Sequence, residues 1–248
     1  MKIEGRECDT MEFLKSSKYD NQFVKENMMG PNALKMIEEL TVNLNLQPGM
    51  KVLDLGCGKG LTSIFLAKEF GVQVYATDLW IGATENFQRF KDFGLEEMII
   101  PIHADANDLP FANEYFDAVI SVDSYYYFGR EDGFMDKKLA PFVKSNGIIA
   151  MSFPGFKEEI HNNLPKEILL SWRAEDMETF HSCEWWQQLL SKSKKITVEA
   201  IDEMMCFEEC WKDWLNCENE YAVNDRRAME AGAGKYMNII SVIARKRR

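Results

Sequence analysis

The sequence predicts an α/β fold, with a mainly parallel sheet covered by helices on both faces. Two observations support this expectation. From Lys51 onward, apolar segments of strand length alternate with helical patterns, and this alternation specifies parallel strands joined by crossover helices. A chain of 248 residues is also long enough for one α/β core with an elaboration.

The first half of the pattern gives most of the expected sheet. A helical segment comes first, with Leu34, Ile37, Leu40 and Leu44 at helical spacing after a break at Gly30. After residue 153 the alternation stops, and helix-forming segments rich in tryptophan follow. The expected strands lie near residues 51–55, 73–77, 98–102, 116–122, 147–153, 196–201 and 238–244.

The most informative segment is the glycine-rich turn after the first strand, Asp54-Leu55-Gly56-Cys57-Gly58-Lys59-Gly60. Alternate glycines allow a sharp turn and a close approach of backbone to a ligand. The spacing is not the G-x-G-x-x-G of pyrophosphate sites, and no phosphate-binding P-loop sequence occurs. The Asp54 carboxylate would repel a diphosphate and suits a ligand with a positive amino group instead. At the end of the next strand, Asp78 is placed to accept hydrogen bonds from a ribose diol.

These residues resemble the class I S-adenosylmethionine-dependent methyltransferases, and the likeness covers roughly residues 48–153. Residues 52–60 resemble the first motif of that family, Asp78 its ribose-binding acid, and residues 104–106 its adenine-contacting segment. The resemblance implies a Rossmann-like seven-stranded sheet, an antiparallel last strand, helical cap elaborations and S-adenosyl-L-methionine as cofactor. The expected cofactor-binding residues are Asp54, Gly56, Cys57, Gly58, Gly60, Asp78, Leu79, Asp105, Ala106, Ser121 and Val122.

The whole chain, residues 1–248, is expected to form a single domain with three parts. Residues 1–47 form an N-terminal helical region, residues 48–153 the cofactor-binding core, and residues 154–248 the cap helices and the last two strands. An apolar set upstream of the core includes Met28 and Met29. This set either covers the cofactor as a lid or packs on the sheet edge, and the sequence does not separate the two.

Candidate catalytic residues follow the fourth strand, where Asp123 and Tyr126 would face the transferred methyl group. The segment is similar to a loop of the cyclopropane-synthase-like branch, but Tyr126 and Tyr127 stand where an acid and a histidine are expected, which argues against cyclopropanation. Of the three histidines, His181 in the cap is the better candidate for a base or substrate contact. His103, at the end of the third strand, is expected to be structural.

Composition limits the partners. The net charge of −11 argues against nucleic acid, because phosphate binding needs a basic surface. The basic residues 245–248 are expected to be a solvated tail. Six cysteines without a C-x-x-C pair predict no metal site, although a thiol role for Cys206 and Cys210 stays open. No membrane-spanning run and a polar N-terminus, residues 1–7, predict a cytoplasmic protein.

Two functions remain in view. The first is a methyltransferase that acts on an oxygen, nitrogen or sulfur atom of a small-molecule acceptor by in-line displacement. The second is a catalytically silent S-adenosylmethionine-binding sensor or partner subunit. Both would bind the cofactor through the same residues, so only turnover separates them. The sequence gives no signal about oligomeric state.

Overall fold

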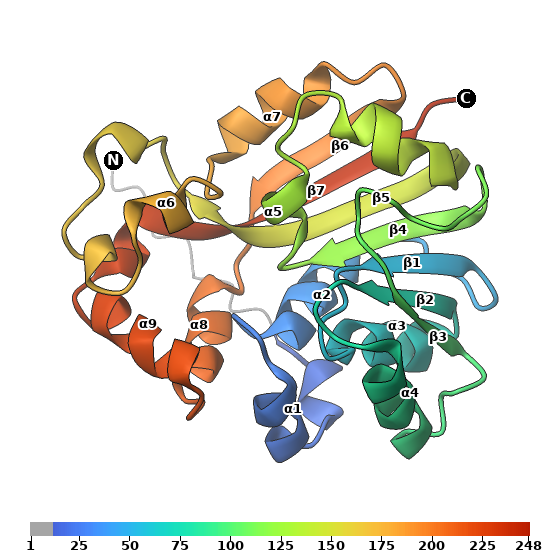
Figure 1. Cartoon of the computed structure of the whole chain (residues 1–248), viewed down its shortest axis with the longest axis horizontal. Coiled ribbons are helices and arrows are strands. Elements are labelled where there is room, and N and C mark those ends of the chain that lie inside the picture. Colours follow the sequence, from blue (N-terminus) through green and yellow to red (C-terminus); the bar gives the residue numbers. More distant parts are fainter. Residues whose placement is uncertain (1–11) are drawn as a thin grey trace, which may run out of the picture.

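A computed structural model describes residues 12–248 of the chain (Figure 1). The expectations for residues 1–7 and for Cys8 therefore lie outside the described part. The seven strands of this part form one sheet in the order β3-β2-β1-β4-β5-β7-β6. They are β1 (Lys51–Leu55), β2 (Gln73–Asp78), β3 (Ile99–His103), β4 (Phe116–Val122), β5 (Val143–Phe156), β6 (Ile196–Glu203) and β7 (Met237–Lys246).

The sheet confirms the predicted topology. Strands β3, β2, β1, β4 and β5 are parallel neighbours, and the last strand, β7, runs antiparallel between β5 and β6. Reversal of order beside β1 places a crevice at the carboxyl ends of β1 and β4. Strand β5 continues to Phe156, beyond the expected end of the core at residue 153.

The expectation of a free basic tail over residues 245–248 is wrong for its first half. Strand β7 extends to Lys246 because it pairs with β5 on one side and with β6 on the other. Arg245 Nε lies 2.7 Å from Glu199 Oε1, and Lys246 Nζ donates to the Ala140 carbonyl at 2.9 Å. Arg247 Nε also donates to the Thr197 hydroxyl at 3.2 Å, so three of the four basic side chains are hydrogen-bonded.

Nine α-helices of the described residues surround the sheet (Figure 1). Short 3-10 turns lie at Ser16–Lys18, Ala140–Phe142, His161–Asn163, Ile168–Leu170 and Ala233–Tyr236, and a π turn at Met135–Leu139. The α-helices are α1 (Asn21–Asn27), α2 (Ala33–Thr41), α3 (Leu61–Phe70), α4 (Ala83–Asp92), α5 (Tyr125–Phe128), α6 (Ala174–Met177), α7 (Cys183–Ser191), α8 (Phe207–Leu215) and α9 (Glu220–Glu230).

Helix α2 joins the N-terminal region to the late insertion. Asn32 caps the helix, because its side chain accepts from the backbone N–H of Leu34 at 3.0 Å. The Asn32 amide also donates to Asp213 on α8 at 2.7 Å, and Lys35 lies 2.8 Å from the same carboxylate. These contacts fix the N-terminal region against α8, which lies between β6 and β7 in the chain.

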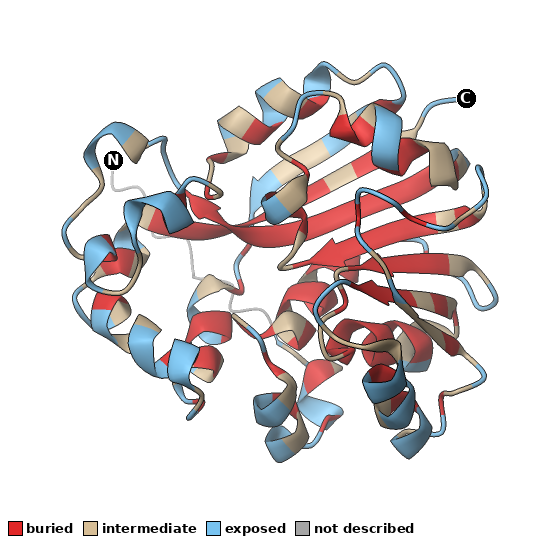
Figure 2. Cartoon of the chain, viewed as in Figure 1, coloured by how far each residue is buried: buried red, intermediate tan, exposed pale blue. Residues whose placement is uncertain are grey.

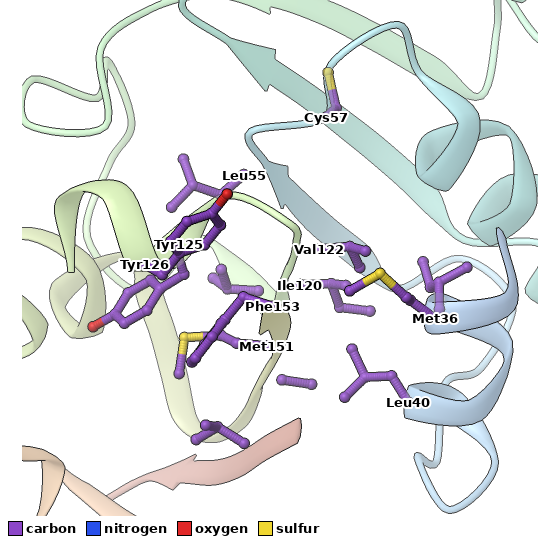
Figure 3. Close-up of a cluster of buried hydrophobic side chains, with 14 of the residues drawn as sticks. Met36, Leu40, Leu55, Cys57, Ile120, Val122, Tyr125, Tyr126, Met151 and Phe153 are labelled. Atoms are coloured by element: carbon purple, nitrogen blue, oxygen red, sulfur yellow. The ribbon is translucent and has the colours of Figure 1, made fainter. Parts of the chain in front are cut away.

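The core follows the central strands. Figure 2 shows burial concentrated along the sheet, while α4 and α9 present exposed faces. In Figure 3 the rings of Tyr125 and Tyr126 lie beside Phe153 of β5, and Met36 and Leu40 of α2 approach Ile120 and Val122 of β4. Tyr125, Phe153 and Met36 are fully buried. Among the described residues, no helix has both the length and the apolar character needed to cross a membrane.

Gly60→Ala tests the packing of the glycine-rich turn on α4. Gly60 has φ +82°, and an added Cβ would lie 2.5 Å from the Phe90 ring. Gly94 also has a positive φ, +65°, but an added Cβ there meets nothing within 4 Å. Both alanines suffer backbone strain, and Gly60→Ala should lower the free energy of unfolding by about 1–3 kcal/mol more than Gly94→Ala. Chemical denaturation measures the difference, and equal costs would contradict this packing role.

Candidate functional site

A cavity of about 290 Å³ opens at the carboxyl ends of β1, β2 and β4. Five segments supply most of its lining: the glycine-rich turn after β1, the end of β2, residues 104–107 after β3, residues 122–124 and 127–128 at and after the end of β4, and residues 27–31 before α2. The parallel strands bring four of these segments together, because the segments all follow strand carboxyl ends. The fifth comes from the N-terminal region and covers the crevice from another side.

The glycine-rich turn is docked on the end of β2. The backbone N–H groups of Gly56 and Cys57 donate to the Thr77 carbonyl at 2.8 and 3.1 Å. Gly56 and Gly58 have φ values of +75° and +51°, which favour glycine. A Cβ at Gly56 would overlap the Ser124 hydroxyl oxygen. The turn thus presents bare backbone to the cavity.

Asp78 is held at the edge of this turn. One carboxylate oxygen, Oδ2, accepts from the Gly58 N–H at 2.8 Å, and the other, Oδ1, accepts from the N–H groups of Trp80 and Ile81 at 2.8 and 2.9 Å. The side chain is buried but lines the cavity. Oδ2 retains a lone pair, so a ligand hydroxyl can add to its one bond.

Eight of the eleven predicted cofactor-binding residues line the cavity. Leu79 and Val122 contribute apolar surface at the ends of β2 and β4, and Leu79 is half exposed. Asp105 is exposed at the cavity, and Ala106 beside it is buried. The eight are Gly56, Cys57, Gly58, Asp78, Leu79, Asp105, Ala106 and Val122. Their contacts with a cofactor stay a prediction.

Asp54, Gly60 and Ser121 do not line the cavity, which corrects the expectation of direct ligand contact. Asp54 is fully buried, and its Oδ2 accepts from the hydroxyls of Thr62 and Ser63 at 2.6 Å each. Burial raises the pKa of Asp54 to about 6, although these two hydrogen bonds lower it. The side chain therefore supports the start of α3 from beneath the turn.

The other two residues also act through packing. Gly60 is the N-cap residue before α3 and lies against Phe90 of α4. Ser121 donates from Oγ to the Leu55 carbonyl at 2.8 Å, which joins the ends of β4 and β1. These residues hold the walls of the crevice, a role that the spacing of the motif does not distinguish from ligand contact.

Asp123 lies at the centre of the cavity wall after β4. Its φ of +56° is unusual for a residue with a Cβ. Oδ1 is buried and has no hydrogen-bond partner among the described residues, and Oδ2 lies against Gly30, where any added Cβ would overlap it. Burial raises the pKa of Asp123 to about 8; the Tyr126 hydroxyl lowers this pKa and the Asp225 carboxylate raises it.

The tyrosines after Asp123 take different positions. Tyr126 is buried and does not line the cavity. Its ring packs edge-on against Phe180, with 5.5 Å between the ring centroids. The cavity lining therefore does not support the predicted contact of Tyr126 with the methyl group. Tyr127 is half exposed, lines the cavity, and meets the Trp80 ring at 5.7 Å. Trp80 is 68% exposed at the cavity mouth, where an aromatic ligand face could stack on it.

His181 lies away from the cavity wall, so the structure gives it no role as the base at this site. Its Nδ1 lies 3.0 Å from Glu159 Oε2, and its ring stacks on Trp185 at 3.6 Å. Burial lowers the pKa of His181, while Glu159 raises it. His103 contacts the Leu79 carbonyl at 2.8 Å at the exposed end of β3, as a structural residue would.

Cys206 and Cys210 are free and buried. The hydrogen bond with the Cys210 thiol, and then burial, raise the pKa of Cys206, which argues against a reactive thiolate. Cys210 Sγ lies 3.4 Å from the Asn32 carbonyl. Both residues act as small hydrophobic groups in α8 and its cap.

Several cavity residues had no sequence signal as site residues. Gly30 was identified only as a helix break, yet its missing side chain makes room for Asp123. Ser124 donates to the Leu55 carbonyl at 2.9 Å and stands under Gly56. Met28 and Met29 also line the cavity, a position compatible with the lid that was one of the two alternatives for this segment.

Comparisons with known proteins agree with this geometry. Residues 52–147 match a family model described as a methyltransferase domain. The chain is 30% identical over 119 residues to the methyltransferase GfsG of Streptomyces halstedii, an alignment of 48% of this chain and 42% of that protein. The chain spans less than half the length of the curated relatives it matches.

Solved structures support the fold. A putative sarcosine dimethylglycine methyltransferase from Galdieria sulphuraria aligns with a TM-score of 0.67 at 17% identity, over 87% of this chain and 86% of that one. Phosphoethanolamine N-methyltransferase 2 of Haemonchus contortus, in complex with S-adenosyl-L-methionine, aligns with a TM-score of 0.72 at 18% identity, over 97% and 61%. At these identities the likeness concerns the fold alone.

Asp123→Asn should flatten the pH dependence of stability between pH 6 and 8. A carboxyl group whose pKa is raised by folding stabilises the native state below its unfolded pKa and loses this contribution as pH rises toward its folded value of about 8. Asp54 has a pKa of about 6, so the stability that it contributes is lost mainly below this pH window. Between pH 6 and pH 8, the free energy of unfolding of the variant should fall by on the order of 1–2 kcal/mol less than that of the original chain.

Urea denaturation at each pH measures this effect. Asparagine tolerates the left-handed backbone of Asp123, so the substitution introduces little strain. Asp108→Asn, at an exposed position, serves as the control and should leave the pH profile unchanged. Parallel profiles for Asp123→Asn and the original chain would show that Asp123 does not titrate as proposed.

Proposed function

We propose, from the premise that the chain belongs to the class I S-adenosylmethionine-dependent methyltransferases, that it transfers a methyl group to a small-molecule acceptor. One observation carries the proposal. The side-chain-free turn of Gly56 and Gly58, the Asp78 carboxylate and Asp123 line one cavity. Residues that could bind the cofactor therefore lie next to Asp123, which could bind the acceptor.

The residues present fit S-adenosylmethionine. Gly56 and Gly58 present bare backbone at the cavity, because a Cβ there would overlap Ser124 or press on Met29, and Asp78 Oδ2 has a lone pair left for a ribose hydroxyl. Asp105, Ala106 and Leu79 would border the adenine, and Trp80 offers an exposed ring at the mouth. When bound, the cofactor supplies an electrophilic methyl group on a sulfonium. The remaining work of the chain is to orient the acceptor and exclude water.

Asp123 would bind and orient the acceptor. A hydrogen-bond donor on the acceptor would bind the Asp123 carboxylate at the cavity wall, and this carboxylate could receive the proton that the acceptor loses. A pKa of about 8 suits such a proton transfer near neutral pH. Tyr126 stays behind this carboxylate and would adjust its basicity rather than touch the acceptor.

The charges around the cavity favour an amine acceptor over an anionic one. Among the described residues, Lys59 is the sole lysine or arginine in the lining, and its Nζ donates to the Glu26 carbonyl at 2.8 Å. Asp78, Asp105 and Asp123 line the same cavity, and Tyr127 adds a ring that can hold a cation. The net charge of −11 further supports a small molecule over nucleic acid, and a cytoplasmic location stays a prediction.

Asp78→Ala should weaken binding of S-adenosylhomocysteine. Loss of a charge-assisted hydrogen bond costs about 1.5–3 kcal/mol, which is a roughly 10- to 150-fold rise in Kd. Calorimetric titration measures the change, with NAD as the comparison ligand. Asp108→Ala removes an exposed carboxylate that does not line the cavity, and this variant should bind as the original chain does. Tight NAD binding, or unchanged affinity in Asp78→Ala, would refute the cofactor assignment.

Asp123→Asn should separate acceptor chemistry from cofactor binding. The variant should bind S-adenosylhomocysteine within about threefold of the original chain, while kcat with the best acceptor falls by roughly 100-fold or more. The acceptor is found by assaying methyl transfer to panels of amines, alcohols and thiols. Asp108→Asn is the matched control. Cofactor binding without turnover on any panel would favour the silent sensor, and full activity in Asp123→Asn would remove that residue from the reaction.

A further inference from the structure

A second cluster of functional groups lies outside the cavity, at the base of the cap. Glu159 and His161 follow β5, and His181 immediately precedes the N-cap residue of α7. The Nδ1 atoms of both histidines lie 3.0 Å from Glu159 Oε2. One ligating atom from each of the three residues lies within 4.8 Å of the others. None of the three lines the cavity described above.

The hydrogen bonds of His161 make this arrangement unusual. Its Nε2 lies 3.2 Å from the Met177 carbonyl oxygen, which can only accept, so Nε2 carries the proton. In a neutral ring Nδ1 is then an unprotonated lone pair that faces a carboxylate oxygen. Such a contact is repulsive unless a cation lies between the two atoms or a second proton charges the ring. A bound metal ion would turn both atoms into ligands.

The groups around the cluster already orient all three side chains. Glu159 Oε1 accepts from the Ser182 N–H at 2.7 Å, which turns Oε2 toward the histidines. The Met177 carbonyl fixes the ring of His161, and Trp185 stacks on His181 at 3.6 Å with an interplanar angle of 4°. Metal-ligating histidines commonly donate their other ring nitrogen to a backbone carbonyl in this way. The His181 side chain is only 13% exposed, so its position is constrained.

We propose that Glu159, His161 and His181 bind one divalent transition-metal ion of the zinc type. Two imidazoles and one carboxylate are a typical ligand set for such ions, and imidazole nitrogen disfavours calcium and magnesium. The set leaves a coordination position for water. The ion would join the segment after β5 to the residue before Ser182, and so close the cap loop between His161 and His181.

The position gives the ion a structural role beside the acceptor wall. The His181 carbonyl accepts from the Phe156 N–H at 3.2 Å, and the His161 ring meets Phe156 at 5.6 Å. The ring centroid of Phe180 lies 5.6 Å from that of Phe156 and 5.5 Å from that of Tyr126. A metal ion bound at this place would stiffen the wall behind Tyr126. Metal binding does not depend on methyl transfer, so the proposal can be tested independently.

Calorimetric titration of chelator-treated protein with Zn²⁺ is the test. We expect one Zn²⁺ per chain and a higher Tm in its presence, because binding to the folded state stabilises it. Glu159→Gln, His161→Ala and His181→Ala should each weaken binding by about tenfold or more. His103→Ala removes the one remaining histidine and should bind Zn²⁺ normally. Circular dichroism and S-adenosylhomocysteine binding check that each variant is folded.

Co²⁺ substitution distinguishes this site from binding by cysteines. Visible ligand-field bands without the strong near-ultraviolet absorption of thiolate ligation would support a site of nitrogen and oxygen ligands. Thiolate absorption, or Zn²⁺ binding that survives all three substitutions, would overturn the proposal. Absence of stoichiometric binding would overturn it as well and would identify the cluster as an ion pair between Glu159 and a protonated histidine.

Discussion

The docking of the glycine-rich turn on the end of β2 is the constraint on which the site depends. The Thr77 carbonyl receives two N–H groups from the turn, at Gly56 and Cys57, and the Asp78 carboxylate receives a third from Gly58. These hydrogen bonds to the last residues of β2 fix the path of the chain between β1 and α3. The turn has positive φ at alternate positions, so only glycine follows this path without strain.

The same turn determines the neighbouring walls. Because Gly56 lacks a side chain, Ser124 can stand beneath it and bond the Leu55 carbonyl at 2.9 Å. This contact fixes the start of α5 and with it the backbone of Asp123. On the opposite side, Met29 approaches Gly58, and Gly30 approaches Asp123. Missing side chains on both segments thus allow the N-terminal region to close over the crevice.

Local patterns were sufficient to predict the sheet. All seven strands were predicted within a few residues, because apolar runs bounded by turn residues report burial directly. The ends of β5 and β7 were missed because a strand end depends on its partner: β7 continues to Lys246 only while β5 and β6 remain beside it. Such pairing joins residues far apart in sequence, which a local pattern does not record.

The site was predictable to the extent that it follows strand ends. Asp78 and Asp105 lie at the cavity because the carboxyl ends of parallel strands meet at one edge. The orientation of Asp54 was not predictable, because it depends on the hydroxyls of Thr62 and Ser63 in the next helix. The contact between Gly30 and Asp123 was missed for a different reason: it joins segments about ninety residues apart in the sequence.

The two halves of the crevice are therefore built differently. The cofactor half consists mainly of backbone, with Gly56 and Gly58 fixed by hydrogen bonds to β2, so substitutions there disturb the fold itself. The acceptor half is formed by side chains such as Tyr127 and Met29, which no such network holds. Tyr127 is half exposed and lines the cavity. Changes of acceptor preference should accordingly arise in this half, at Met28, Met29 and Tyr127, while the turn that positions the cofactor stays constant.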